Sequence, residues 1–476
     1  MSIKINNKLW QLTEIIGLHF IDLLVSLLAM VIVARSFDLA GFGIYSYLVG
    51  VFHIVAFISE AGICDRFRNR YALDQDREQL LTASAGALLC TGLAVVIFFL
   101  ITGVFDTSLT RIEERLSAYF LIAAAVPIGN SNRLRITLLH VEGDHKTATR
   151  LVLQKNLLFL GCIWLLSFWG QPSILVGSFL IAEVFLRLAS IKRVDIPPIF
   201  RTSFIANAIQ TVRDSLRHLF SGETFTLIFH ADLFILGLFV TSDELGVYAE
   251  AALFARLFLL VPVALRPVMH RHFARLVSAE DTRTFATNLI AFRAYLFYGH
   301  SLLALFLTNY FSDILHLLLG FYGSEKISYD LFTLMLPGFL FYAAAIVNES
   351  ALEASGNAPF LSQLSTIFIS ANVLFCFYLI PFAGIFGAAI ASLLCLLIYF
   401  FTLNTFKITT VCPTKILEFL AAGSTVYLFH SFLKQLNLSL VFFAITVPPL
   451  LYLAFYLLNF FDIGDYNTVD DPHPPM

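Results

Sequence analysis

Glu223-Thr-Phe-Thr-Leu-Ile-Phe-His-Ala-Asp-Leu-Phe-Ile-Leu-Gly-Leu-Phe239 is an apolar stretch with three ionisable side chains. Ser242-Asp-Glu-Leu-Gly-Val-Tyr248 follows it, and then a second apolar run that carries Arg256. An ionisable group costs roughly 3 kcal/mol or more at the centre of a bilayer, so such groups usually face a protein interior or a water-filled cavity. This region therefore predicts two apolar helices joined by a short polar turn, with charges that face other helices or a cavity.

A similar pattern occurs in the first half of the chain, at Ser36-Phe-Asp-Leu-Ala-Gly-Phe-Gly-Ile-Tyr-Ser46. A Gly-x-Tyr triplet opens an apolar run in each half, and Pro127 and Pro337 each precede a glycine-containing turn at a similar interval. We interpret the two halves as a duplication that runs in the same direction through the membrane, a known transporter design. Chance recurrence of glycine and proline among many helices is the alternative.

Composition excludes a soluble globular protein, because 58% of the residues are apolar and only 13% are charged. Apolar runs of about 20 residues, enough to cross a bilayer, recur along nearly the whole chain. The alternating pattern of an outer-membrane barrel is absent. The fold class predicted is an all-α polytopic membrane protein with about 14 transmembrane helices, namely two six-helix lobes and two further C-terminal helices.

The predicted spans are 12–34, 43–63, 80–103, 117–140, 151–169, 173–190, 218–240, 246–267, 286–308, 329–351, 360–380, 384–403, 416–433 and 438–458. They predict an N-terminal lobe at 1–198, a C-terminal lobe at 199–411, two extra helices within 412–462 and a disordered cytoplasmic tail at 463–476.

Lysine and arginine gather in alternate connections, which is the pattern that sets membrane orientation. One set of connections holds Arg66, Arg68, Arg70, Arg77, Lys146, Arg150, Lys192, Arg193, Arg201, Arg213, Arg217, Arg271, Arg275, Arg283, Lys407 and Lys415. The other set holds only Arg35, Arg111, Arg115, Lys326 and Lys434. We therefore expect the first set, and both termini, to be cytoplasmic.

No motif indicates an enzyme, a metal site or a cofactor. The six cysteines are scattered, and the sequence has no metal-ligand spacing, no P-loop and no nucleophile motif. The basic connections follow from membrane topology and anionic lipid, so they do not indicate nucleic acid as a partner. We expect no catalytic residue, no metal and no cofactor.

The sequence resembles bacterial polysaccharide-export flippases. Four stretches carry this resemblance: the region from His230 to Pro267, Gly320-Phe-Tyr-Gly323, Glu353-Ala-Ser-Gly-Asn357, and Pro381-Phe-Ala-Gly-Ile-Phe-Gly-Ala-Ala-Ile-Ala-Ser392. The superfamily also contains drug antiporters and the peptidoglycan-precursor flippase. The resemblance covers roughly residues 10–405. It implies two six-helix lobes that form a V, and movement of a lipid-linked oligosaccharide to the outer leaflet by alternating access.

Arginine would suit the phosphates of such a substrate, because its planar fork pairs with two oxygens at once. Arg133, Arg135 and Arg256 lie inside predicted spans, and Asn130 stands one helical turn before Arg133. We predict that these four residues line a substrate cavity, although residues 133 and 135 point to different sides of their helix. The alternative is that the arginines extend to the inner interface or pair with acids, which we favour for Arg293.

Two other groups of residues are candidates for the cavity or for ion coupling. His19 and Asp22 lie one turn apart and could couple transport to a proton gradient, or they could pair with an arginine of the other lobe. His230 and Asp232 are predicted to line the cavity or to join the lobes, with an interhelical packing bond as the alternative.

The remaining charged pairs lie near helix ends. Glu349 and Glu353, at i and i+4, could form a cation site or an inner gate, although solvation at the interface is the simpler explanation. Glu183 and Arg187 have the spacing of a local ion pair.

The predicted function is an inner-membrane flippase for a polyprenyl-diphosphate-linked oligosaccharide, used in assembly of O-antigen, capsule or exopolysaccharide. Its partners would be this substrate, membrane lipid and the polysaccharide polymerase or other assembly proteins. A drug antiporter of the same fold is the main alternative. A membrane-embedded glycan polymerase or ligase is disfavoured, because no predicted outer connection is large.

Overall fold

The computed structural model describes residues 21, 24–71, 77–105, 112–190, 204–216, 224–320 and 323–405, and within these ranges the chain is helical with no strand. A helix occupies Leu24–Ser36. The labelled elements are α2 (Leu39–Glu60), α3 (Ile63–Tyr71), α4 (Arg77–Phe105), α5 (Ile112–Val141), α6 (His145–Ser167), η1 (Pro172–Val176), α7 (Gly177–Ser190), α8 (Phe204–Ser215), α9 (Thr224–Leu236), α10 (Ser242–Ser278), α11 (Thr282–Asn309), α12 (Phe311–Leu318), α13 (Glu325–Ala354) and α14 (Ala358–Thr405).

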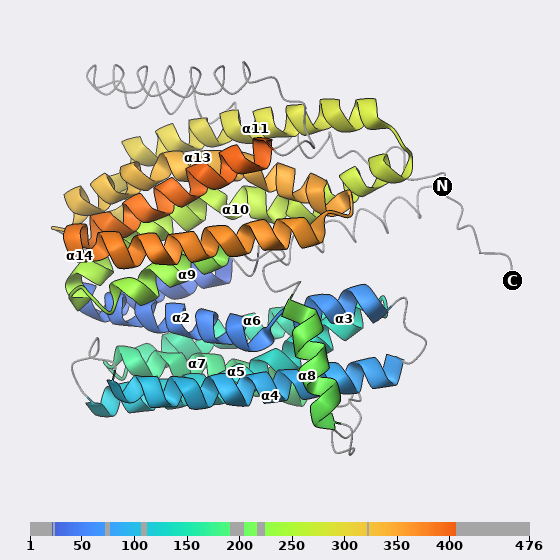
Figure 1. Cartoon of the computed structure of the whole chain (residues 1–476). Helices are drawn as coiled ribbons and strands as arrows, with labels where there is room; N and C mark the ends of the chain where they lie inside the picture. The colour runs from blue at the N-terminus through green and yellow to red at the C-terminus, as the bar shows by residue number, and fades with distance from the viewer. Residues whose placement is uncertain are drawn as a thin grey trace, which may run out of the picture.

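The helices form two bundles that lie side by side with their long axes roughly aligned (Figure 1). We call the helices from Leu24 to Ser190 the N lobe and α9 to α14 the C lobe. Helix α8 lies between them in sequence and crosses the N-lobe helices steeply. The predicted spans 416–433 and 438–458 lie outside the described residues, as does the first half of span 12–34.

Helix starts follow from polar residues in the short connections. The Asp38 carboxylate accepts a hydrogen bond from the Gly41 amide at 2.9 Å and caps α2. Thr241 and Glu244 form a reciprocal capping box at α10, which is why this helix begins earlier than the predicted span. Asp281 caps α11 through the Thr284 amide at 2.9 Å. These caps satisfy amides that have no partner within their helix.

Seven described helices are long and apolar enough to cross a bilayer, and α10 is an eighth if its two bent halves count as one span. Helix α14 comprises two predicted spans, because its 48 residues are about twice the length needed to cross a bilayer. The chain turns back at Gly384, whose φ of 55° and ψ of −133° break the helix, three residues after Pro381. Figure 1 shows the two arms of α14 leaving one end of the C lobe.

The molecule has two different ends. Gly43 and Gly246 lie near the starts of α2 and α10, at what we call the glycine end. The opposite end carries α3, α8 and the turn between α10 and α11, and we call it the basic end (Figure 1). The connections predicted to be rich in lysine and arginine begin or end there, so the fold reproduces the predicted alternation of the spans.

We expect replacement of Gly384 by alanine to destabilise the protein by about 1–3 kcal/mol, because only glycine adopts this backbone conformation without strain. No atom lies within 4 Å of a Cβ added at Gly384, so the loss would come from the backbone alone. Gly161→Ala is the matched control, because Gly161 has the same open surroundings and lies inside α6. Thermal unfolding in detergent should show a lower midpoint for Gly384→Ala and an unchanged or higher one for Gly161→Ala. Equal midpoints would show that the turn at Gly384 is not required.

Candidate functional site: the seam between the lobes and the charges beside it

One stripe of α2 brings the two lobes together. A Cβ on Gly43 would collide with the backbone of Ser242 and Gly246, and a Cβ on Gly246 would collide with the Leu39 carbonyl oxygen. The backbones of α2 and α10 therefore touch at the Gly-x-Tyr triplets that the sequence repeats. Only glycine permits this approach, as in other closely packed membrane helices.

The stripe continues along α2 at intervals of three or four residues. The Tyr47 ring stacks on Phe234 of α9 at 6.1 Å between centroids. Further along the same face, the His53 ring stacks on His230 of α9 at 4.3 Å and an interplanar angle of 17°. His230 is buried and thus belongs to the seam between the lobes, one of the two roles expected for it. The seam uses the part of α2 from Gly43 to His53.

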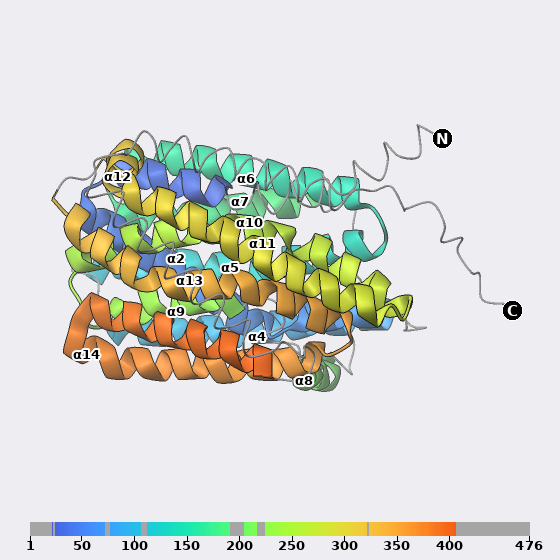
Figure 2. The ribbon, with the colours of Figure 1, turned by 90° about the horizontal axis from the view of Figure 1, so that it is seen from above.

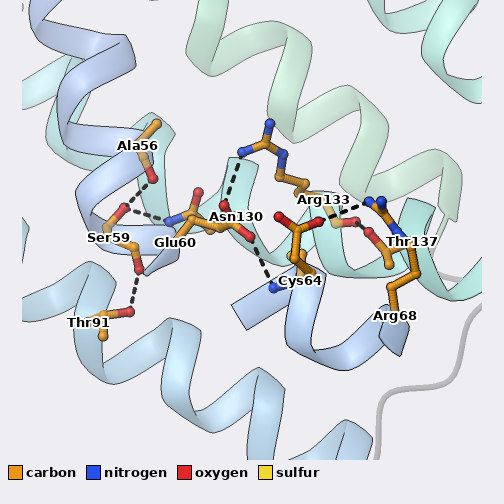
Figure 3. A network of polar contacts seen from close by, with 10 residues as sticks. Ala56, Ser59, Glu60, Cys64, Arg68, Thr91, Asn130, Arg133 and Thr137 are labelled. Carbon is orange, nitrogen blue, oxygen red and sulfur yellow. Dashed lines mark hydrogen bonds and ion pairs between the residues drawn. The ribbon is translucent and has the colours of Figure 1, made fainter. Parts of the chain in front are cut away.

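The last turn of α2, at the basic end, faces α5 and carries a charged network (Figure 3). The Arg133 guanidinium lies 3.3 Å from the Glu60 carboxylate, which also accepts the Cys64 amide at 3.0 Å. The Asn130 side chain donates to the Ser59 hydroxyl at 2.6 Å. Glu60 and Asn130 are buried, whereas 47% of the Arg133 side chain is exposed. Arg133 is thus a cation that a buried acid tethers and solvent still reaches.

Arg135 points away from Arg133, as the helical spacing predicts. It is 3% exposed, and its Nη1 donates to the Ser190 hydroxyl of α7 at 3.5 Å. This contact lies inside the N lobe, between α5 and α7.

The expected local pair of Glu183 and Arg187 does not form. Lys155 of α6 lies 3.4 Å from Glu183, and Arg187 donates to the Ser131 hydroxyl of α5 at 2.8 Å. The prediction considered only one helix, whereas α7 packs against both α5 and α6.

The C lobe carries a second charged network, on the helices equivalent to α2 and α5. Arg266 of α10 lies 3.3 Å from Glu349 and 2.7 Å from Glu353 of α13. The Tyr399 hydroxyl donates to Glu349 at 2.7 Å. Glu349 is 1% exposed, so solvation at the interface, the simpler explanation offered above, does not apply to it. Sequence reasoning missed Arg266, although two glutamates one turn apart in an apolar helix require a cation.

The acid and the arginine exchange helices between the two networks. In the N lobe the acid lies on α2 and the arginine on α5, whereas in the C lobe the arginine lies on α10 and the acids on α13. His270 of α10, 42% exposed, lies 3.9 Å from Glu353. The N lobe thus presents a partly exposed cation, Arg133, paired with an acid, and the C lobe presents a partly exposed imidazole, His270, near Glu353.

Arg293 of α11 is buried rather than extended to the interface. It is 2% exposed, and among the described residues its three nitrogens have no hydrogen-bond partner. Its guanidinium lies 6.0 Å from the centroid of the Phe400 ring, the outer limit of a cation–π contact. A buried cation without hydrogen bonds is costly, so Arg293 is a strong candidate for a functional role. The sequence favoured a position at the inner interface instead.

Asp232 lies inside the C lobe. Its carboxylate is fully buried and accepts hydrogen bonds from Tyr248 at 3.0 Å, from the Cys376 thiol at 3.2 Å and from the Ser392 hydroxyl. Within the described parts of the chain, no cationic side chain forms an ion pair with it. A carboxylate surrounded by neutral donors can exchange a proton or hold a monovalent cation, which makes Asp232 a candidate for ion coupling.

Three predicted site residues cannot be placed. His19, Asp22 and the side chain of Arg256 lie outside the described residues, and their predicted roles stay predictions. The backbone at Arg256 is described, and α10 bends there by 44° between Ala255 and Leu257. Over the described ranges, no three His, Cys, Asp or Glu side chains gather closely enough to hold a metal ion.

Residues 13–271 match the protein family described as "Polysaccharide biosynthesis protein". The chain belongs to this family. The resemblance found in the sequence is confirmed, and this polysaccharide biosynthesis protein is a multi-pass membrane transporter. No curated protein matches it.

Solved structures of transporters share the fold. The lipid II flippase MurJ in an inward closed conformation superposes with a TM-score of 0.71 at 14% identity, over 93% of this chain and 98% of that chain. An inward-facing multidrug resistance MATE family transporter of the MOP superfamily gives 0.61 at 12% identity, over 80% and 93%. A mutant of the MATE transporter VcmN of Vibrio cholerae gives 0.54 at 14% identity, over 85% and 96%. These superpositions establish an all-α fold of two lobes and confirm the predicted fold class.

We expect Arg266→Met to destabilise the C lobe by about 3–5 kcal/mol, because it leaves the buried Glu349 without its cation. The double variant Arg266→Met/Glu349→Gln should recover a large part of this loss. Unfolding free energies of the two single variants and the double variant form a thermodynamic cycle that measures the coupling. Additive losses would mean that the contact contributes nothing.

We expect Asp232→Asn to weaken the C-lobe core and transport together, because one acceptor oxygen becomes an NH2 donor facing hydroxyl and thiol donors. The loss of stability should be about 1–3 kcal/mol, the cost of leaving buried polar groups unsatisfied. Ser392→Ala is the control, since it removes one donor and leaves the carboxylate. Thermal unfolding and surface polysaccharide should be measured on both. Wild-type transport and stability in Asp232→Asn would show that the carboxylate charge is dispensable.

Proposed function

We propose that this transporter is a flippase that moves a polyprenyl-diphosphate-linked oligosaccharide from the cytoplasmic to the outer leaflet of the bacterial inner membrane, by alternating access. Membership of a polysaccharide biosynthesis family supports a glycan substrate. The basic end would face the cytoplasm, in accordance with the positive-inside rule.

The observation that carries this proposal is that Arg133 is partly exposed to solvent and paired with a buried acid. About half of its side chain is exposed, and its guanidinium lies 3.3 Å from the buried carboxylate of Glu60 at the end of α2. An incoming diphosphate could replace or share that carboxylate and gain charge-assisted hydrogen bonds from the same fork. Across the seam, His270 and Arg266 of the C lobe have the corresponding arrangement with Glu353.

The seam supports alternating access. Where lobes touch through glycine backbones and stacked rings, separation breaks few strong bonds, and each lobe keeps its own charged network intact. In the cytoplasm-facing state of this cycle, the basic end would receive a substrate made in the cytoplasm. Buried Asp232 would be one site for a coupling proton or cation.

We expect Arg133→Ala to lower export of surface glycan about tenfold or more, because a charged hydrogen-bonding partner of the phosphates is lost. Arg133→Lys should retain part of the activity, since it keeps the charge but not the fork. Arg283→Ala is the control, as it removes an exposed arginine at the basic end of α11. The measurements are surface polysaccharide and the leaflet distribution of the lipid-linked precursor at equal protein levels.

Precursor trapped in the inner leaflet, with normal export in Arg283→Ala, would support the flippase. Full activity of Arg133→Ala would remove this residue from the substrate path. Deletion of the gene with no change in the precursor, in a host without a redundant transporter, would favour the small-molecule antiporter instead.

A further inference from the structure

Arg35, at the end of the first N-lobe helix, contacts the C lobe. Its Nε donates to the Leu318 carbonyl oxygen at 3.1 Å, and its Nη2 donates to the Leu317 carbonyl oxygen. Both acceptors belong to the last turn of α12, at the glycine end of the C lobe. Figure 2 shows α12 beside the helix Leu24–Ser36.

The end of α12 has a chemical need for this donor. The last carbonyls of a helix have no amide partner within it, and the C-terminus carries partial negative charge. In α12 the amides of Leu319 and Gly320 both return to the Leu315 carbonyl oxygen, and Gly320 then turns the chain with a φ of 77°. Among the described residues, no backbone amide donates to the carbonyls of Leu317 and Leu318, and the guanidinium donates to both.

Each side of the contact is fixed to its own lobe. In the C lobe, Leu315 is fully buried, the Phe311 ring stacks on Phe332 at 5.3 Å, and His316 lies 3.3 Å from Glu325 of α13. On the other side, Val33 and Ala34 of the Arg35 helix are buried, and the short link Phe37–Asp38 joins this helix directly to α2 of the N lobe. Movement of one lobe against the other at this end therefore has to break the Arg35 bonds.

We propose that Arg35 is a latch that holds the glycine end closed by capping α12 of the opposite lobe. The contacts beneath it, from Gly43–Gly246 to His53–His230, are made by backbone packing and stacked rings, which have no formal charge at the glycines and little directionality. Arg35 adds two directional, charge-assisted hydrogen bonds at the outer edge of the glycine end, the part that moves furthest when the lobes separate there. It thus sets how often this end opens, before any substrate is bound.

This inference rests on the alternating access of the proposed function, but not on its substrate. The test is therefore a distance measurement on the full chain in lipid nanodiscs without substrate. Spin labels on Gln171→Cys in the N lobe and Ser312→Cys in the C lobe report the width of the glycine end, since both positions are exposed there. The exposed Cys90 and the unplaced Cys412 are replaced by serine in every variant.

Arg35→Gln should raise the ratio of open to closed distances about three- to tenfold, the range expected for loss of exposed charge-assisted bonds. Arg35→Lys should give an intermediate ratio, since it keeps the charge with a single donor group. Lys326→Gln is the control, because it removes a positive charge from an exposed position at the start of the neighbouring α13.

An unchanged ratio in Arg35→Gln, or an equal change in Lys326→Gln, would overturn the latch. The result separates the two proposals. A shifted ratio in a protein that does not move lipid-linked glycan would uphold the latch and reject the substrate. An unchanged ratio of open to closed distances, with glycan export intact, would reject the latch and uphold the substrate.

Discussion

The contact between Gly43 and Gly246 is the constraint on which the arrangement of this transporter depends. Two helices approach closely enough for backbone atoms to touch only where neither carries a side chain. Because the glycines occupy equivalent positions in the two halves, their contact sets how the two lobes are placed against each other. Tyr45 and Tyr248, two residues further on, are buried, and Tyr248 donates to Asp232 within the C lobe. The seam at the glycine end follows from this single crossing.

The charged side chains inside the membrane region are organised by lobe. Glu60 and Arg133 stabilise one bundle, and Arg266 with Glu349 stabilises the other, so each lobe neutralises its own buried charges. A buried pair of this kind adds little net stability but is strongly disfavoured when broken. The lobes can therefore move as rigid bodies without exposing an unpaired charge. Arg293 and Asp232 depart from this rule, because neither charge has an oppositely charged partner among the described residues.

Much of the fold was predictable, because apolar runs, alternating basic connections and the repeated Gly-x-Tyr triplets are local signals. The partners of the buried charges could not be predicted from the sequence. The sequence suggested Glu183 with Arg187, whereas Lys155 and Ser131 on neighbouring helices take these roles. It also overlooked Arg266, because pairing across helices depends on packing that spacing along one helix does not contain. Arg293 shows the same limit, since depth in a bundle cannot be read from distance to a helix end.

The reversal of α14 has a consequence for biogenesis. The turn around Gly384 contains no lysine or arginine, and apolar helix continues on both sides of it. The insertion machinery therefore meets one uninterrupted apolar segment, with no charged connection to mark where the first arm ends. The two arms have to enter the membrane together as a hairpin, and Ser392, which donates to Asp232 of α9, then fixes the second arm against a helix inserted earlier. Correct placement of this hairpin thus depends on the part of the C lobe that is synthesised before it.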